Sequence, residues 1–202
     1  IVVYHCAMDP SDRQIVRRPS DGDLPEPPIP GPGGPAAPPS HKPVAPGMEM
    51  DVRVSALAFG GQAIARVEGF VVFVWGALPG ESVRVHIDRV RKHYAEATLL
   101  RVVKPSPDRR APQCRHFGHC GGCRWQLLDY EAQLQVKRQH VRDCLERLGG
   151  FSTFDTEPIR RMPDPWRYRN KVEFSVGRDP QGTTVVGFHP PGRWDTVMQI
   201  QE

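Results

Sequence analysis

Residues 60–85 read GGQAIARVEGFVVFVWGALPGESVRV, and the pattern of this stretch decides the fold class. Apolar and polar residues alternate in AIARV and again in SVRV, and glycine or the PGE turn bounds each run. FVVFVW, at 70–75, is a nearly continuous apolar run, as expected for a strand that is buried on both faces. Short apolar runs that turn residues interrupt at regular intervals predict antiparallel β structure in a small barrel or sandwich.

The flanking segments supply the remaining strands. MDVRVSAL, at 50–57, alternates with Val52 and Val54 on one face, and HYAEATLLRVV, at 93–103, closes the set. Along SVRVHIDRV the alternation predicts two faces: Val83, Val85 and Ile87 inward, and Arg84, His86 and Asp88 outward. Five strands in about 55 residues fit one OB-like barrel, which we place at residues 48–104.

The composition indicates a water-soluble chain with a modest core. Of the 202 residues, 25% are charged and 39% are hydrophobic, and no apolar run is long enough to span a bilayer. The opening IVVYHCAMD is too short and too soon charged for a secretory signal, so we expect a cytoplasmic protein with no membrane partner. The 27 Lys and Arg residues outnumber the 23 Asp and Glu residues, which gives a mild preference for anionic partners.

Residues 1–47 differ from the rest because they contain 12 of the 22 prolines. Proline fixes its φ and has no backbone donor, so we expect a disordered arm there. Its composition would suit a proline-rich docking segment, but it favours a tail or untranslated sequence upstream of the true start. Met48, where the alternating pattern begins, is the candidate initiator.

Three of the five cysteines lie together in CRHFGHCGGCRWQ, residues 114–126. Cys114, Cys120 and Cys123 have the spacing C-x5-C-x2-C, and an odd total with a tight cluster argues against a secreted disulfide scaffold. Thiolates are soft ligands, so we expect an iron–sulfur cluster or zinc. The two glycines favour the cluster, because they allow a tight bend that turns backbone N–H groups toward sulfur.

The remaining candidate ligands are weaker. Zinc would need His116 or His119 as a fourth ligand, and both lie closer to a cysteine in sequence than zinc ligands commonly do. Cys144 lies in a predicted helix beside its apolar stripe, where packing is expected rather than ligation. Cys6 falls in the proline-rich arm and is set aside.

A helix is expected after the cysteines. Asp129 is a good N-cap with Glu131 in the first turn, and Gly149–Gly150 ends the helix. An apolar stripe follows it at three- and four-residue steps or their sum: Leu127, Tyr130, Leu134, Val141, Leu145 and Leu148. We therefore expect residues 105–150 to form a cysteine loop and one helix.

Three more strands are expected in residues 151–202. They are WRYRNKVEFSVG at 166–177, TTVVGFH at 183–189 and WDTVMQIQ at 194–201, and turn sequences separate them. These strands predict the start of an antiparallel-sheet central domain. With the barrel and the helix, they make the expected fold class α+β.

Basic residues gather at three places, with aromatic residues among them. The first place is on the barrel: Arg84, Arg89, Arg91, Lys92, His93 and Tyr94. The second leads toward the cysteines: Lys104, Arg109, Arg110 and Arg115. The third opens the predicted second sheet: Arg167, Tyr168, Arg169, Asn170 and Lys171. Each residue alone is an ordinary surface charge. Three such patches predict RNA binding only because the barrel that they flank resembles an RNA-binding domain, as described below.

The quoted motifs resemble a known family. Residues 60–85 look like a TRAM domain, a small OB-like RNA-binding barrel. The segment from KPSPDRRAPQC through CGGCRWQ to the following helix resembles the iron–sulfur segment of the RNA uracil-5-methyltransferases, and VGFHPPGRW resembles their central domain. The resemblance implies a [4Fe-4S] cluster on Cys114, Cys120 and Cys123, with the fourth cysteine due just beyond Glu202.

The resemblance also implies an activity for a longer protein. In that family a cysteine thiolate adds to C6 of uracil, and C5 then takes a methyl group from S-adenosylmethionine. Neither that nucleophile nor a glycine-rich cofactor loop is found in this sequence. We therefore expect this chain to be an N-terminal part of such an enzyme without the methyltransferase domain. We do not expect this part to bind S-adenosylmethionine itself. The motifs favour ribosomal RNA, 23S rRNA above all, over transfer RNA as the partner.

Other classes of protein stay open at this point. A non-catalytic TRAM-type RNA-binding protein with an iron–sulfur or zinc site would show the same motifs, and so would a transfer RNA uridine methyltransferase. A radical methylthiotransferase also joins a TRAM domain to a cluster. In that class the cysteine spacing is C-x3-C-x2-C and the TRAM domain comes last, whereas in this chain the spacing is C-x5-C-x2-C and the TRAM-like segment comes first.

Overall fold

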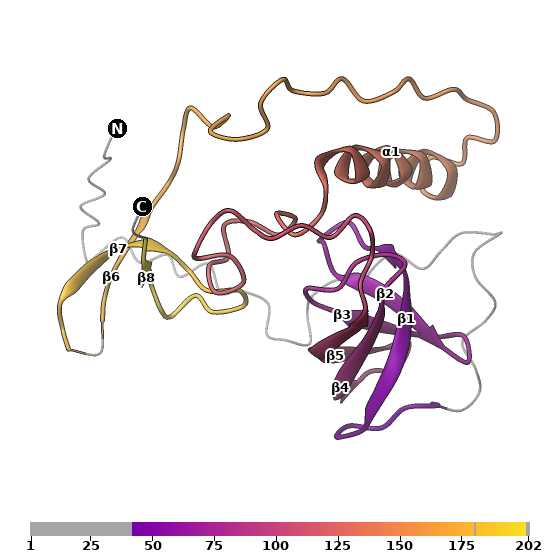
Figure 1. Ribbon diagram of the computed structural model, residues 1–202, viewed down its shortest axis with the longest axis horizontal. Coiled ribbons are helices and arrows are strands. Elements are labelled where there is room, and N and C mark those ends of the chain that lie inside the picture. The colour runs from indigo at the N-terminus through magenta and orange to yellow at the C-terminus, as the bar shows by residue number, and fades with distance from the viewer. Residues whose placement is uncertain (1–41, 180, 201–202) are drawn as a thin grey trace, which may run out of the picture.

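Five strands close into a barrel, which confirms the expected OB-like fold (Figure 1). The computed structural model describes residues 42–179 and 181–200, so Cys6 and the proline-rich arm up to residue 41 lie outside the described residues. The strands are β1 (Glu49–Leu57), β2 (Ala63–Val67), β3 (Phe70–Val74), β4 (Ser82–Val90) and β5 (Tyr94–Lys104). Their order around the barrel is β1-β2-β3-β5-β4, with β3 and β5 parallel and the other pairs antiparallel.

Alternation along the strands fills the inside of the barrel. Val52 and Val54 are buried, and the predicted inward residues of β4 are all fully buried: Val83, Val85 and Ile87. The expectation that β3 is buried on both faces is wrong, because Val71 and Phe73 are only partly covered. A closed barrel of this size has a single interior, so alternate residues of every strand must point outward.

Ordered structure begins before Met48. Val44, in the stretch expected to end the arm, is buried in the barrel core. The N–H of Gly47 donates to the carbonyl of Ile87 at 2.8 Å, and the N–H of Ile87 donates to the carbonyl of Met48 at 2.8 Å. These bonds extend the edge of the barrel to residues that the composition alone placed in the arm.

Helix α1 (Tyr130–Arg147) lies along one end of the barrel (Figure 1). Asp129 caps it as predicted, because its side chain accepts from the N–H of Glu131 at 3.0 Å. Leu134 is buried and Leu145 partly so, but Val141 and Leu148 are exposed, so the apolar stripe is fully buried only near its start. Cys144 is exposed as well, and its expected burial is wrong.

A second sheet of three antiparallel strands follows: β6 (Ser175–Arg178), β7 (Thr184–Phe188) and β8 (Met198–Gln199). A strand from residue 166 was expected, but residues 166–174 are not in a strand. The pairing gives the reason, because the ladder between β6 and β7 ends with Ser175 opposite Gly187, and β7 itself ends one residue later at Phe188. In the described part of the chain, no helix has the length and apolar character needed to cross a membrane.

Candidate RNA-binding surface and cysteine loop

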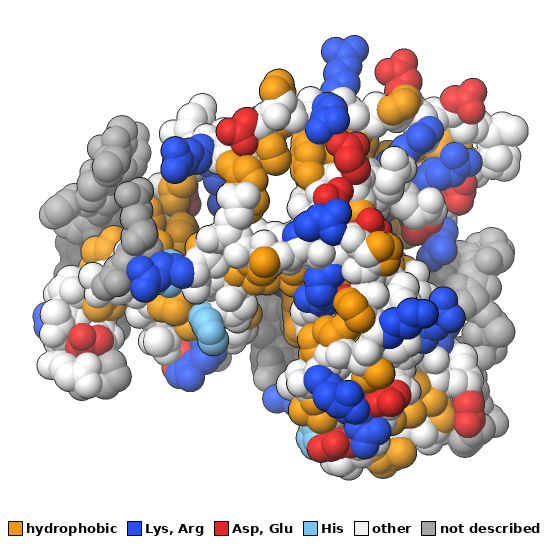
Figure 2. Space-filling view, in the orientation of Figure 1, with side chains coloured by type: hydrophobic (Ala, Val, Ile, Leu, Met, Phe, Trp, Pro, Cys, Tyr) orange, Lys and Arg blue, Asp and Glu red, His pale blue; other side chains and the backbone are white. Residues whose placement is uncertain are grey.

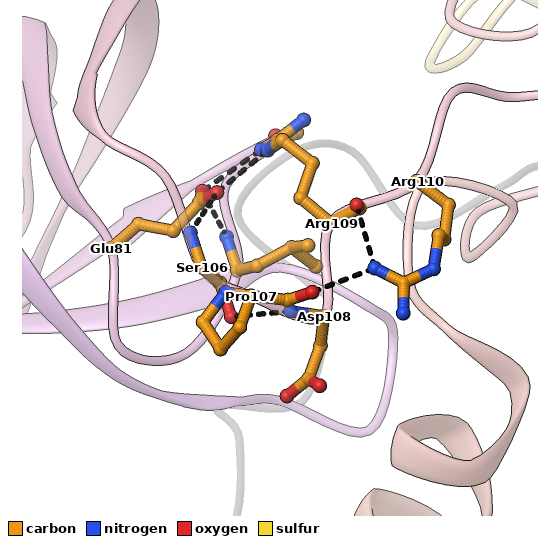
Figure 3. A network of polar contacts seen from close by, with 8 residues as sticks. Glu81, Ser106, Pro107, Asp108, Arg109 and Arg110 are labelled. Carbon is orange, nitrogen blue, oxygen red and sulfur yellow. Dashed lines mark hydrogen bonds and ion pairs between the residues drawn. The ribbon is translucent and has the colours of Figure 1, made fainter.

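A buried ion pair fixes the segment that leads from the barrel to the cysteines (Figure 3). The carboxylate of Glu81, the residue directly before β4, is fully buried. Arg109 donates to it twice, from Nε to Oε1 at 2.6 Å and from Nη2 to Oε2 at 2.8 Å, and Nη2 also donates to the carbonyl of Gly76 at 2.8 Å. The N–H groups of Leu78 and Ser106 donate to the same carboxylate at 2.9 and 3.2 Å.

This arrangement keeps the Glu81 carboxylate charged inside the protein. Burial by itself raises the pKa of Glu81, but the hydrogen bonds and charge of Arg109, with the two backbone donors, outweigh it and hold the pKa below its ordinary value. The planar fork of Arg109 is therefore occupied by Glu81 and is not directed at a ligand. The structure gives Arg109 a stabilising role in place of the predicted contact with RNA.

The cysteine loop is a series of tight turns. The N–H of Cys120 donates to the carbonyl of His116 at 2.9 Å, and the N–H of Phe117 donates to that of Cys114 at 3.1 Å. The N–H of Gly122 points at Sγ of Cys120 at 3.3 Å, as expected for a CGGC turn that supplies amide donors to sulfur. The side chain of Gln126 closes the loop by accepting from the N–H of Cys114 at 3.1 Å.

The loop is docked on the second sheet through Gly121. Its N–H donates to the carbonyl of His189 at 2.9 Å, and a Cβ on Gly121 would lie 2.7 Å from that same oxygen. Only glycine therefore fits at 121. A Cβ on Gly122 would lie 3.8 Å from the ring of Phe188, so this end of β7 also lies against the cysteine loop.

The three thiols suit a soft metal in their chemistry, and a backbone N–H already faces one sulfur. Cys114 and Cys123 are exposed and Cys120 is partly buried. Among the residues that the structure describes, however, no group of three or more His, Cys, Asp or Glu side chains is arranged to hold a metal ion. The metal site thus stays a prediction that rests on the donor set and on the turn geometry.

A cavity of about 960 Å³ lies between the cysteine loop, the start of α1 and residues 165–172. Cys123 lines it, and so do basic and aromatic side chains: Arg110, Arg124, Lys137, Arg167, Arg169, Trp125, Tyr130, Trp166 and Tyr168. The structure therefore brings two predicted RNA-binding residues, Arg167 and Arg169, to the cysteine loop. Lys171 of the same predicted patch pairs with Glu173 at 2.9 Å and is partly neutralised by it.

The predicted barrel patch lies at the opposite end of the barrel from the cysteine loop. Arg89, Arg91 and Lys92 are exposed around the β4–β5 turn. Lys104, of the second predicted patch, is exposed at the other end of β5, where the chain leads toward the cysteine loop. Tyr94 packs its ring against Phe73 at 5.4 Å between centroids.

Arg84 lies within 3.4 Å of Asp51 and 3.7 Å of Glu49, so its charge is already compensated. Figure 2 shows Lys and Arg side chains spread over both the barrel and the helix on one face.

The sequence patterns missed several of these residues. Glu81 was not singled out, although a carboxylate next to a proline–glycine turn and an apolar strand is a visible signal of a buried charge. Arg124 and Lys137 were missed as cavity residues, because what brings them to Arg169 is a contact across the fold that local spacing does not encode.

Comparison with known proteins identifies the barrel. The model of the TRAM domain matches residues 43–100, which includes Val44 and most of the closed barrel. This chain carries a TRAM domain. The TRAM domain begins five residues before Met48, in agreement with the burial of Val44.

The relatives of this TRAM-domain chain extend beyond the barrel. It is 41% identical over 144 residues to a protein of Gloeobacter violaceus and 43% identical over 151 residues to one of Nitratidesulfovibrio vulgaris, each named an uncharacterized RNA methyltransferase. These matches cover 71% and 75% of this chain but 32% of each relative, so the chain spans about a third of the length of the curated relatives it matches. A conserved protein of Methanococcus maripaludis, solved in solution, is 36% identical with a TM-score of 0.30, and the match covers 34% of this chain and 96% of that one.

Proposed function

We propose that this chain is the RNA-binding part of an S-adenosylmethionine-dependent RNA methyltransferase. The observation that carries the proposal is the identity of 41–43% to proteins named RNA methyltransferases, over a stretch too long to be the TRAM domain alone. The basic and aromatic cavity beside the cysteine loop supports it, because guanidinium groups bind phosphates and aromatic rings stack on bases.

The proposed reaction is methylation of C5 of a uridine, with ribosomal RNA, 23S rRNA in particular, favoured over transfer RNA. The base must leave its stack before a thiolate can reach C6, so the enzyme needs a firm hold on the surrounding RNA. S-adenosylmethionine would supply the methyl group that C5 of the uridine takes up. In this proposal the chain binds and orients the RNA through the β4–β5 turn and through the cavity beside the cysteine loop.

The cysteine loop is proposed to hold a [4Fe-4S] cluster on Cys114, Cys120 and Cys123. Methyl transfer is not a redox reaction, so the role of the loop would be to tie the barrel and α1 to the second sheet, where Gly121 already contacts His189. Assays for iron, zinc and sulfide after anaerobic purification test the proposal. One zinc per chain without sulfide would instead assign a zinc site.

RNA binding is tested with the double variant Arg91→Ala/Lys92→Ala, which removes two exposed cations from the β4–β5 turn. Binding of RNA should weaken, and the slope of log K against log salt should become shallower by about 0.7 for each phosphate of a single strand that the variant no longer neutralises. Arg193→Ala is the matched control, because Arg193 is already paired with Asp195 at 3.0 Å. Unchanged binding of the double variant at two salt concentrations would remove the β4–β5 turn from the RNA surface.

The catalytic half of the proposal is tested by reading the coding sequence beyond the codon for Glu202. A cysteine within a few codons, followed by a glycine-rich cofactor motif and a later cysteine, would support a uridine methyltransferase. A stop codon there would favour the non-catalytic RNA-binding protein.

A further inference from the structure

Two aromatic side chains stand out from the barrel near the cysteine loop. Phe59, in the β1–β2 turn, is 84% exposed, and Trp75, directly after β3, is 44% exposed. Trp75 continues the outward row of Val71 and Phe73 along β3, since alternate residues of a strand share a face. Exposed apolar side chains that gather in one patch, with polar groups around them, mark an interaction surface.

The cysteine loop supplies a cation to this surface. The guanidinium of Arg124 lies over the ring of Trp75 at 4.8 Å, and its Nη1 donates to the carbonyl of Gly60 at 3.4 Å. Gly61, at a φ of +91°, lies so close to the loop that a Cβ on it would be 2.6 Å from Nε1 of Trp125. The β1–β2 turn and the cysteine loop therefore form one continuous surface.

Helix α1 completes the surface from the other side. Nε2 of His140 is 2.8 Å from the carbonyl of Leu57, which anchors the imidazole to the end of β1. The same ring lies 6.0 Å from the ring of Phe59 and 5.8 Å from that of Trp125. Lys137, one turn earlier in the helix, lies 5.9 Å from the ring of Trp125.

We propose that these six residues form a stacking platform for unpaired RNA bases: Phe59, Trp75, Arg124, Trp125, Lys137 and His140. This inference rests on the proposed RNA-binding function and specifies which form of RNA is recognised. Unpaired bases stack on aromatic rings and on guanidinium planes, whereas bases inside a duplex are already stacked on each other. The β1–β2 turn is also one of the positions at which OB-like barrels bind oligonucleotides.

The platform gives its members different roles. Phe59 and Trp75 offer exposed aromatic surface on which bases can stack, and the guanidinium of Arg124, which lies over the ring of Trp75, extends that surface. Lys137 and Arg124 carry the positive charge that phosphates require. Because Arg124 directly follows Cys123, the conformation of the cysteine loop sets the position of this cation over the barrel.

The test measures binding of the 202-residue chain to a labelled single-stranded oligoribonucleotide and to a duplex of the same length. Phe59→Ala and Trp75→Ala should each weaken single-strand binding on the order of tenfold, with the salt slope unchanged. Arg124→Ala should weaken it and also reduce the slope by about 0.7. Leu100→Ala is the matched control, since it removes another exposed apolar side chain, 47% exposed, from β5.

The outcomes separate this inference from the proposed function. If the unchanged chain binds RNA and Phe59→Ala and Trp75→Ala bind it equally well, or if duplex binds as tightly as single strand, the platform is refuted while RNA binding stands. If the unchanged chain binds no RNA, the proposed function fails and the platform fails with it. Phe59 is so exposed that its replacement leaves the barrel folded, which circular dichroism checks.

Discussion

Replacing Arg109 with alanine tests the reasoning about the buried carboxylate. The variant leaves Glu81 fully buried and removes two charged hydrogen bonds, at 2.6 and 2.8 Å, together with the bond to the carbonyl of Gly76. Two backbone donors, from Leu78 and Ser106, stay with the carboxylate. The carboxylate thus keeps part of its hydrogen bonding but loses its counter-charge.

The magnitude follows from this inventory. Removing one partner of a buried ion pair costs about 3–5 kcal/mol of unfolding free energy. The lower end applies here, because two backbone donors remain and the side chain of Arg109 is 27% exposed, which lets water approach the vacated space. We expect the free energy of unfolding to fall by about 3 kcal/mol, which for a domain of roughly 60–100 residues lowers Tm by roughly 12–24 °C.

Thermal and urea unfolding followed by circular dichroism measure the loss. Arg110→Ala is the matched control, because its neighbouring guanidinium is 52% exposed and pairs with Asp129 at 3.2 Å, as a surface ion pair. Such a pair contributes less than about 1 kcal/mol. Tm values for the two variants within a few degrees of each other would refute the stabilising role of Arg109 and return it to the RNA surface.

The pH dependence gives an independent check. In the folded chain the pKa of Glu81 lies below its ordinary value of 4.5, so the stability it contributes is present above that value and is lost as the pH falls through the lowered pKa. In Arg109→Ala burial acts with less opposition, so the pKa of Glu81 rises and the carboxyl can take up a proton. The difference in Tm between the parent and the variant should therefore shrink as the pH falls below the ordinary value, and a constant difference would contradict this account.

Two further changes have defined outcomes. Cys120→Ser removes the sulfur to which the N–H of Gly122 points, and this variant should have a lower Tm than the parent. Cys144 is exposed, so Cys144→Ser should leave Tm unchanged. Equal Tm values for the two variants would contradict a structural role for the cysteine loop. Gly61→Ala puts a methyl group about 2.6 Å from the indole of Trp125 at a φ of +91°, and should cost on the order of 1–3 kcal/mol by urea unfolding. Gly60→Ala has open space around it and should cost far less, so similar losses would refute the close packing at Gly61.

The barrel could be predicted because its determinants are local. Alternation in β4 assigned Val83, Val85 and Ile87 to the interior without knowledge of any partner strand, and all three are buried. The same logic failed for residues 166–174, which are equally compatible with a strand. A strand needs a neighbour to take up its backbone hydrogen bonds, and the pairing with β7 ends at Ser175.

The site could be predicted only in part, for a related reason. Ligand chemistry is local, so three cysteines in ten residues were visible as a candidate metal loop, but the cavity depends on Cys123 and Arg169 meeting across the fold. Counting charges was also a poor guide to the surface. Arg84 faces Asp51, Arg109 is taken by Glu81 and Lys171 pairs with Glu173, so three residues predicted to bind RNA already have partners within the protein.

Exposed aromatic residues are a sharper signal of a binding surface than basic ones in this chain. A surface cation is well solvated and needs no ligand, so its presence alone distinguishes nothing. An aromatic ring in water has an unfavourable hydration that a ligand can relieve, and Phe59 has no place in the barrel core that would explain it. The ring of Phe59 lies 6.0 Å from that of His140, and Arg124 binds the carbonyl of the next residue, Gly60, so side chains from two other segments meet at this turn. Such a meeting of aromatic and basic side chains is what a stacking site for single-stranded RNA requires, and no single stretch of the sequence displays it.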